Sequence, residues 1–225
     1  MKLNEFNDQI VYLVGGTSGI GLAIAEQLSR AGAHIILLAR TESKLQHAHA
    51  RVQKLAINAQ QRFTYQCLDV SDPVATRSVL NELVYSFGAP KALINCAGRA
   101  IPQPIENISY QQFDDTMKIN LYGCRNTVAA LLPHMKKSGG LIVNTASLAG
   151  VIGVFGYSDY CASKFALIGY SEALRSEVKK YNIKVSVLCP PDTDTPGFEI
   201  ENTTKPLETQ AISQSASLLS SEQVA

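Results

Sequence analysis

The chain has 225 residues, of which 46% are hydrophobic and 17% are charged, and its formal net charge is +1. A chain of this length and apolar content suits one domain with a sizeable core, and the near-neutral charge gives no indication of a nucleic-acid or acidic partner. The sequence has no apolar run long enough for a transmembrane helix, and its polar first residues lack the apolar core of a secretion signal.

The five cysteines and four histidines form no redox or metal-binding motif. The cysteines are dispersed without a Cys-x-x-Cys pair, which predicts small buried thiols in a reducing compartment rather than disulfides or zinc ligands. His47 and His49 are two residues apart on an expected helix, so they point to different faces. We therefore expect no metal and a cytoplasmic protein, with contact at a membrane surface left open.

Apolar strand-like segments alternate with helix-like segments along the chain. The expected strands are residues 10–14, 34–39, 62–68, 91–95, 140–146 and 183–189. The expected helices are residues 19–31, 42–57, 73–87, 109–136 and 158–181. This alternation predicts an α/β fold with a single Rossmann-like, doubly wound parallel sheet and helices on both faces. Ligands of such sheets bind beyond the carboxyl ends of the strands, so the residues that follow each strand matter most.

The first expected strand leads directly into the glycine-rich segment Gly15-Gly-Thr-Ser-Gly19-Ile-Gly21 and then into an amphipathic helix. A glycine-rich string alone is often only a turn, but strand, glycine turn and helix in this order are typical of a dinucleotide site. The glycines let the pyrophosphate approach the backbone, and the helix N-terminus offers free N–H groups and a positive dipole end. The residues expected to bind the cofactor here are Gly15, Thr17, Ser18, Gly19, Ile20 and Gly21.

The second expected strand ends at Ala39 and is followed by Arg40. Sites that prefer NAD usually have a carboxylate here for the ribose 2′-OH, whereas an arginine suits the 2′-phosphate of NADP. Arg40 and Lys44 are therefore expected to bind that phosphate, and Glu42 is expected to face solvent. This pattern favours NADPH, although a solvated loop charge at Arg40 is the alternative.

The most informative catalytic pattern is Ser147, followed by Tyr160 and then by Lys164. Tyr160 and Lys164 lie one turn apart on the same face of an expected helix. A nearby ammonium group favours the phenolate, so the pattern predicts a lowered pKa for Tyr160 and proton transfer near neutral pH. Tyr-x-x-x-Lys also arises by chance, but Tyr160 is the only tyrosine in this chain with a lysine four residues later. We expect a site for interconversion of a carbonyl and an alcohol.

Taken together, these motifs resemble the short-chain dehydrogenase/reductase family over essentially the whole chain. The family's glycine motif appears with Val14 in place of a leading threonine, and its Asn-Asn-Ala-Gly element appears with Cys96 in place of the second asparagine. The resemblance implies the catalytic set Asn120, Ser147, Tyr160 and Lys164. It also implies further cofactor contacts from Asp69, Val70, Asn95, Ala97, Gly98, Tyr160, Lys164, Pro190, Thr193 and Thr195.

A narrower resemblance rests on the string Pro190-Pro191-Asp-Thr-Asp-Thr-Pro-Gly-Phe198. This string is similar to the sphingolipid subgroup of the family, whose members reduce 3-ketosphinganine to sphinganine with NADPH. The resemblance implies a lipophilic ketone substrate and a homo-dimer or homo-tetramer. The apolar stretch 148–156, with Phe198 and Ile200, is expected to form the substrate pocket, although part of it also suits ordinary core or subunit contacts.

The chain also departs from that subgroup in two ways. The subgroup's eukaryotic members carry membrane-associating hydrophobic segments, and none is visible in this sequence. Residues 220–225 resemble the start of a helix, whereas the family pattern continues with another helix and a strand. We therefore expect residues 1–225 to form a single dinucleotide-binding and catalytic domain without that final helix and strand. The alternatives left open are a reductase for another ketone, such as a 3-oxoacyl thioester or a steroid-like ketone, and a non-catalytic NADPH-binding sensor.

Overall fold

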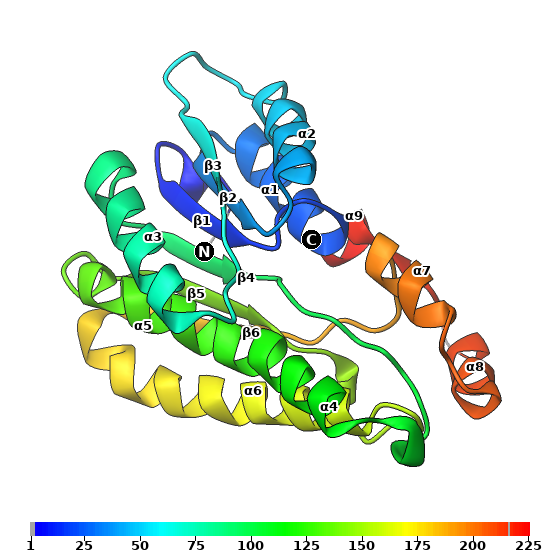
Figure 1. The fold of residues 1–225 in the computed structure, drawn as a ribbon. Coiled ribbons are helices and arrows are strands. Elements are labelled where there is room, and N and C mark those ends of the chain that lie inside the picture. Colours follow the sequence, from blue (N-terminus) through cyan, green and yellow to red (C-terminus); the bar gives the residue numbers. More distant parts are fainter. Residues whose placement is uncertain (1–2, 216) are drawn as a thin grey trace.

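The fold is built on a six-stranded parallel sheet with the strand order β3-β2-β1-β4-β5-β6, shown in Figure 1. The computed structural model describes residues 3–215 and 217–225. The strands are β1 (Ile10–Val14), β2 (His34–Ala39), β3 (Phe63–Cys67), β4 (Ala92–Asn95), β5 (Gly140–Thr145) and β6 (Ile183–Leu188). All neighbouring strands are parallel. Strands β2 and β3 lie on one side of β1, and β4, β5 and β6 lie on the other, so the switch point of the sheet is between β1 and β4. The predicted doubly wound sheet is confirmed.

Helices cover both faces of this sheet (Figure 1). They are α1 (Gly19–Arg30), α2 (Glu42–Gln53), α3 (Pro73–Phe87), α4 (Tyr110–Met117), α5 (Gly123–Met135) and α6 (Ser158–Val178). Along β1, Val11 and Leu13 pack with α1 and α2, whereas Tyr12 and Val14 pack with α3, α5 and α6. Because successive side chains of a strand point to opposite faces, this two-sided cover explains why the central strands β1, β2 and β4 are apolar at nearly every position, whereas the edge strands β3 and β6 carry exposed polar residues such as Gln66 and Lys184.

Two of the expected helices differ from the observed ones in detail. The expected helix 109–136 is α4, a π-helical turn at Lys118–Tyr122, and α5. The expected helix 42–57 ends at Gln53, and the loop after it is held by the buried side chain of Gln61. Gln61 accepts hydrogen bonds from the backbone N–H groups of Ile57 and Asn58, so these residues leave the helix. The pattern of apolar residues does not show either of these local changes.

The chain after β6 forms short elements beside the sheet. They are β7 (Thr193–Asp194), α7 (Pro196–Asn202), α8 (Leu207–Gln214), β8 (Leu219–Ser220) and α9 (Ser221–Val224). Strands β7 and β8 pair in parallel, and α9 lies beside α1 (Figure 1). Ser220 and Gln223 form a capping box at the start of α9, so the predicted helix start after Ser220 is confirmed.

Neither a membrane-spanning helix nor a cluster of metal ligands is found in the part of the chain that the structure describes. None of the helices there is both long and apolar enough to cross a bilayer. No three histidine, cysteine, aspartate or glutamate side chains within residues 3–215 and 217–225 lie close enough together to hold a metal ion. All five cysteines are free thiols.

Candidate active site

One cavity of about 620 Å³ runs along the carboxyl ends of the strands. Its walls come from the loops after all six strands of the main sheet and from α7, as expected for a ligand site of a doubly wound sheet. The predicted site residues that line it are Gly15, Thr17, Ser18, Gly19, Ile20, Gly21, Arg40, Lys44, Asp69, Val70, Ala97, Gly98, Ser147, Tyr160, Lys164, Pro190, Thr193 and Thr195. Among the predicted catalytic and cofactor-binding residues, Asn95 and Asn120 do not line it.

The glycine-rich loop after β1 is packed too closely for larger residues. Gly15 has a φ of +80°, and a Cβ atom there would lie 2.6 Å from the backbone nitrogen of Ala97. Gly19 has a φ of +52°, and a Cβ atom there would lie 2.8 Å from the side chain of Thr195. Glycine is therefore required at both positions, for its backbone conformation and for space.

The same loop presents hydrogen-bond donors to the cavity. The backbone N–H groups of residues 16–21 donate to no other group of the described chain. Ser18 is the N-cap residue of α1, but its hydroxyl makes no capping hydrogen bond. Free N–H groups at a helix N-terminus bind anions, so this end of the cavity fits the pyrophosphate of a dinucleotide.

Basic residues line the cavity beyond β2. Arg40 and Lys44 are both exposed there, and no carboxylate follows β2 directly. Glu42 is exposed and does not line the cavity, and its carboxylate accepts hydrogen bonds from Cys67 and Gln46. Burial opposes ionisation of Asp69, yet hydrogen bonds from Ser71 and the charge of Arg40 lower the pKa of Asp69. This end of the cavity therefore has cations positioned for an anionic group.

Ser147, Tyr160 and Lys164 lie together on the cavity wall. Ser147 follows β5 and accepts a hydrogen bond from the backbone N–H of Ala149 at 3.1 Å. The buried Lys164 Nζ donates to the backbone oxygen of Thr145 at 2.8 Å and lies 5.5 Å from the centre of the Tyr160 ring. The i, i+4 spacing on α6 thus places phenol and ammonium on one face, next to the end of β5.

The pKa of Tyr160 changes in the direction opposite to the sequence prediction. Burial of the phenol raises its pKa, and the nearby carboxylate of Glu201 raises it further, while the hydrogen bond with Ser147 lowers it. Burial also lowers the pKa of Lys164. The prediction of a lowered pKa for Tyr160 is wrong for the protein alone, because sequence spacing shows the neighbouring ammonium but not the loss of solvent around the phenol.

Asn120 lies behind the cavity wall in the π-helical turn and is fully buried. Its side-chain oxygen accepts from the backbone N–H of Arg99 at 2.9 Å, and its nitrogen donates to Arg99 O and to Ser163 Oγ, both at 3.0 Å. Single π-helical turns inside α-helices are frequent at functional sites. Asn120 therefore joins the loop after β4 to α6 close to Lys164.

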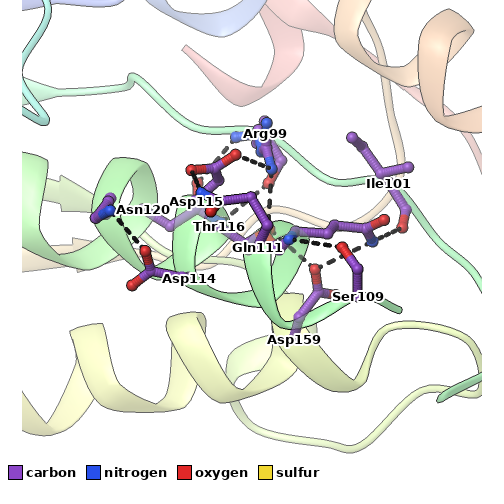
Figure 2. A network of polar contacts seen from close by, with 11 residues as sticks. Arg99, Ile101, Ser109, Gln111, Asp114, Asp115, Thr116, Asn120 and Asp159 are labelled. Carbon is purple, nitrogen blue, oxygen red and sulfur yellow. Dashed lines mark hydrogen bonds and ion pairs between the residues drawn. The ribbon is translucent and has the colours of Figure 1, made fainter. Parts of the chain in front are cut away.

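A polar network below this wall holds the first turn of α6 (Figure 2). Asp159 is fully buried and accepts from the backbone N–H of Tyr160 at 2.7 Å and from Thr116 Oγ1 at 2.9 Å. Gln112 donates to Asp159 at 3.4 Å and to the backbone oxygen of Ile101 at 3.1 Å. The sequence analysis missed Asp159, whose position beside Tyr160 was the only available signal. Its contacts fix α4 against the start of α6.

Asn95 is part of a second buried network and does not reach the cavity. Its side chain donates to Asn144 Oδ1 at 2.9 Å and accepts from Thr127 Oγ1 at 2.9 Å. Asn144 donates in turn to Ser171 on α6 at 3.0 Å. The side chain of Asn95 thus joins the ends of β4 and β5 to α5 and α6.

The family model described as short chain dehydrogenase matches residues 9–206. The chain belongs to the short-chain dehydrogenase family. It is 43% identical over 223 residues to 3-dehydrosphinganine reductase of Danio rerio, covering 98% of this chain and 67% of that protein. It is also 43% identical over 217 residues to 3-ketodihydrosphingosine reductase of Bos taurus, covering 96% of this chain and 65% of that protein. The chain thus spans about two thirds of the length of these curated relatives.

Solved structures agree with the family fold. L-sorbose reductase from Gluconobacter frateurii, complexed with NADPH and L-sorbose, is 25% identical with a TM-score of 0.85, covering 97% of this chain and 87% of that chain. Levodione reductase is 25% identical with a TM-score of 0.87, covering 97% of this chain and 88% of that chain. The Rossmann-like fold of the short-chain dehydrogenases therefore holds for this chain.

The segment after β6 lines the same cavity as Ser147, Tyr160 and Lys164. The hydroxyl of Thr193 donates to the backbone oxygen of Pro191 at 2.8 Å, and Thr195 Oγ1 accepts from the backbone N–H of Phe198 at 3.0 Å, which caps α7. Helix α7 brings Phe198, Ile200 and the carboxylate of Glu201 to the wall. The sequence analysis expected the two apolar residues and missed Glu201, which no motif marks.

Proposed function

We propose that this short-chain dehydrogenase reduces the ketone of 3-ketosphinganine to the secondary alcohol of sphinganine, with NADPH as the reductant. The observation that carries the proposal is that one cavity joins a dinucleotide loop at one end to Ser147, Tyr160 and Lys164 at the other. The identity of 43% to reductases named for this substrate supports the choice of ketone.

The choice of NADPH rests on the residues after β2. Arg40 and Lys44 line the cavity, whereas Glu42 lies outside its lining and accepts a hydrogen bond from Cys67. Asp69 also lines the cavity, but it follows β3 and not β2. An arginine at this place suits a 2′-phosphate, whereas NAD sites usually have a carboxylate for the ribose hydroxyl. The free N–H groups of residues 16–21 are proposed to bind the pyrophosphate, and the nicotinamide of the bound cofactor would supply the hydride.

The chain's own residues are proposed to handle the proton and the orientation of the ketone. The raised pKa of Tyr160 keeps its phenol protonated, so Tyr160 holds a proton to donate to the carbonyl oxygen. Ser147 is placed to donate a hydrogen bond to the same oxygen, and the Lys164 ammonium stabilises the phenolate that remains. Asn120 and Asp159 act as positioning residues, since neither lines the cavity.

The apolar part of the cavity suits the hydrocarbon chain of the substrate. Its apolar lining includes Leu148, Ile152, Val154, Phe198, Ile200 and Ile212. Val151 and Phe155, which were expected in the pocket, do not line it and are 52% and 47% exposed. Exposed apolar side chains next to this opening favour peripheral contact with a membrane surface, from which a lipid enters. A cytoplasmic site of action and a homo-dimer or homo-tetramer are also part of this proposal, by analogy with the family.

The test is a turnover assay of the purified protein with NADPH and 3-ketosphinganine. We expect consumption of NADPH, followed by its absorbance, with sphinganine detected by mass spectrometry. A 3-oxoacyl thioester and a steroid ketone serve as competing substrates, and Tyr160→Phe serves as the inactive control. Turnover that is faster with either competing ketone, or equal in Tyr160→Phe, would refute the proposal.

A further inference from the structure

The carboxylate of Glu201 lies in the same cavity as the reacting groups. Glu201 is half-buried on α7, and its charge is close enough to Tyr160 to raise the pKa of that phenol. Asp192 lines the cavity as well and acts on Tyr160 in the same direction. The catalytic phenol thus has negative charge on the side of α7.

Tyr157 fixes the position of this carboxylate. The hydroxyl of Tyr157 donates to Glu201 Oε2 at 2.9 Å. The ring centres of Tyr157 and Tyr160 lie 5.6 Å apart. Tyr157 thus contacts both the carboxylate of Glu201 and the ring of the catalytic residue, so the position of Glu201 relative to Tyr160 is fixed.

The carboxylate of Glu201 has unused acceptor capacity. Within the described residues, the hydrogen bond from Tyr157 is the only one that its side chain accepts, and it forms no ion pair. The charges of Lys164 and Lys205 act on Glu201, but the ammonium groups of both lysines donate their hydrogen bonds to other residues. Lys164 donates to Thr145 O, and Lys205 donates to Ser213 Oγ with its ammonium 3.8 Å from the centre of the Phe198 ring. A carboxylate accepts up to about four hydrogen bonds, so Glu201 can accept more from a ligand.

The proposed substrate carries a matching cation. In 3-ketosphinganine the carbon next to the ketone bears a primary amine, which is protonated near neutral pH. When the ketone oxygen is at Tyr160 and Ser147, this ammonium group must lie within the same part of the cavity. A buried or half-buried carboxylate that faces a cationic donor forms a strong, charge-assisted hydrogen bond.

We propose that Glu201 binds the ammonium group of the substrate and thereby selects 2-amino ketones over ketones that lack this cation. This inference rests on the proposed function and names the residue that recognises the polar end of the substrate. Asp192 adds negative charge to the same side of the cavity.

The experiment compares two ketones and two variants. The substrates are 3-ketosphinganine and 1-hydroxyoctadecan-3-one, which has the same chain and ketone but no amine. Glu201→Gln removes the charge and keeps an acceptor for Tyr157, and Glu199→Gln is the control on the exposed face of the same helix. We expect Glu201→Gln to lower kcat/KM for the amino ketone roughly 10- to 100-fold and to change that for the other ketone by less than about 2-fold. Glu199→Gln should change neither value.

The outcomes separate the inference from the proposed function. An equal loss on both ketones would show that Glu201 only supports α7, and no loss on the amino ketone would show that it does not bind the amine; either result overturns the inference alone. If Glu201→Gln does not fold, the comparison of the two ketones on the wild-type protein still tests the inference, because equal kcat/KM values for them would overturn it. Wild-type protein that reduces neither ketone would overturn the proposed function, and the inference with it.

Discussion

Replacing Asp159 tests whether a buried carboxylate holds the catalytic end of α6 in place. Asp159→Ala removes the acceptor of the Tyr160 N–H at 2.7 Å and of the Thr116 hydroxyl at 2.9 Å. Thr116 retains a second acceptor, the backbone oxygen of Gln112 at 2.9 Å, so only the Tyr160 N–H is left without a partner. The contact from Gln112 to Asp159, at 3.4 Å, is long and adds little.

The expected loss follows from these contacts. A hydrogen bond to a charged group contributes about 1.5–3 kcal/mol, and a negative charge in the first turn of a helix contributes about 0.3–1 kcal/mol. We therefore expect Asp159→Ala to lower the free energy of unfolding by about 2–4 kcal/mol. Asp159→Asn keeps an oxygen for the Tyr160 N–H and can donate to Thr116, so it should cost only about 1 kcal/mol. In both variants kcat should fall more than KM rises, because Tyr160 is displaced while the cavity walls remain.

Urea unfolding followed by circular dichroism measures these differences, and steady-state kinetics measures the effect on turnover. Glu177→Gln, at an exposed position of the same helix, is the matched control and should stay within about 0.5 kcal/mol of the wild type. The reasoning fails if Asp159→Ala is as stable as the control, or if Asp159→Asn is as unstable as Asp159→Ala.

Three further predictions concern the cofactor and the proton. Tyr160→Phe should remove nearly all turnover and leave NADPH affinity, measured by fluorescence titration, largely unchanged; normal turnover would exclude Tyr160 as the proton donor. Arg40→Asp should raise KM for NADPH far more than KM for NADH, and equal changes would place recognition of the 2′-phosphate elsewhere. Because Glu201 raises the pKa of Tyr160, Glu201→Gln should move the alkaline loss of ketone reduction to lower pH. An unchanged or upward-shifted pH–rate profile would contradict that coupling.

The sequence was sufficient for the parts of the site that depend on local order. The glycine-rich loop and the Tyr160–Lys164 pair both follow from spacing within one strand–turn–helix unit or one helix, and the structure places them in one cavity. The central strands β1, β2 and β4 were predictable because strands covered on both faces are almost wholly apolar, and β6 was predictable because its apolar residues alternate with exposed polar ones.

The remaining features depend on contacts between distant segments. Glu201 accepts a hydrogen bond from Tyr157, 44 positions away in the chain, and Asn95 donates one to Asn144, 49 positions away. Strands β7 and β8 have two residues each, too few for any periodic pattern. The direction of the Tyr160 pKa was missed for the same reason, since burial is produced by the whole fold.

The close packing of Gly19 against Thr195 has a consequence for redesign of this protein. Thr195 caps the helix that carries Phe198 and Glu201, whereas Gly19 belongs to the loop at the dinucleotide end. An added methyl group at position 19 would lie 2.8 Å from the side chain of Thr195, so the capping residue would have to move. Changes to the loop that holds the dinucleotide therefore act directly on the residue that caps the helix at the ketone end, so the two ends of the cavity are not independent targets for redesign.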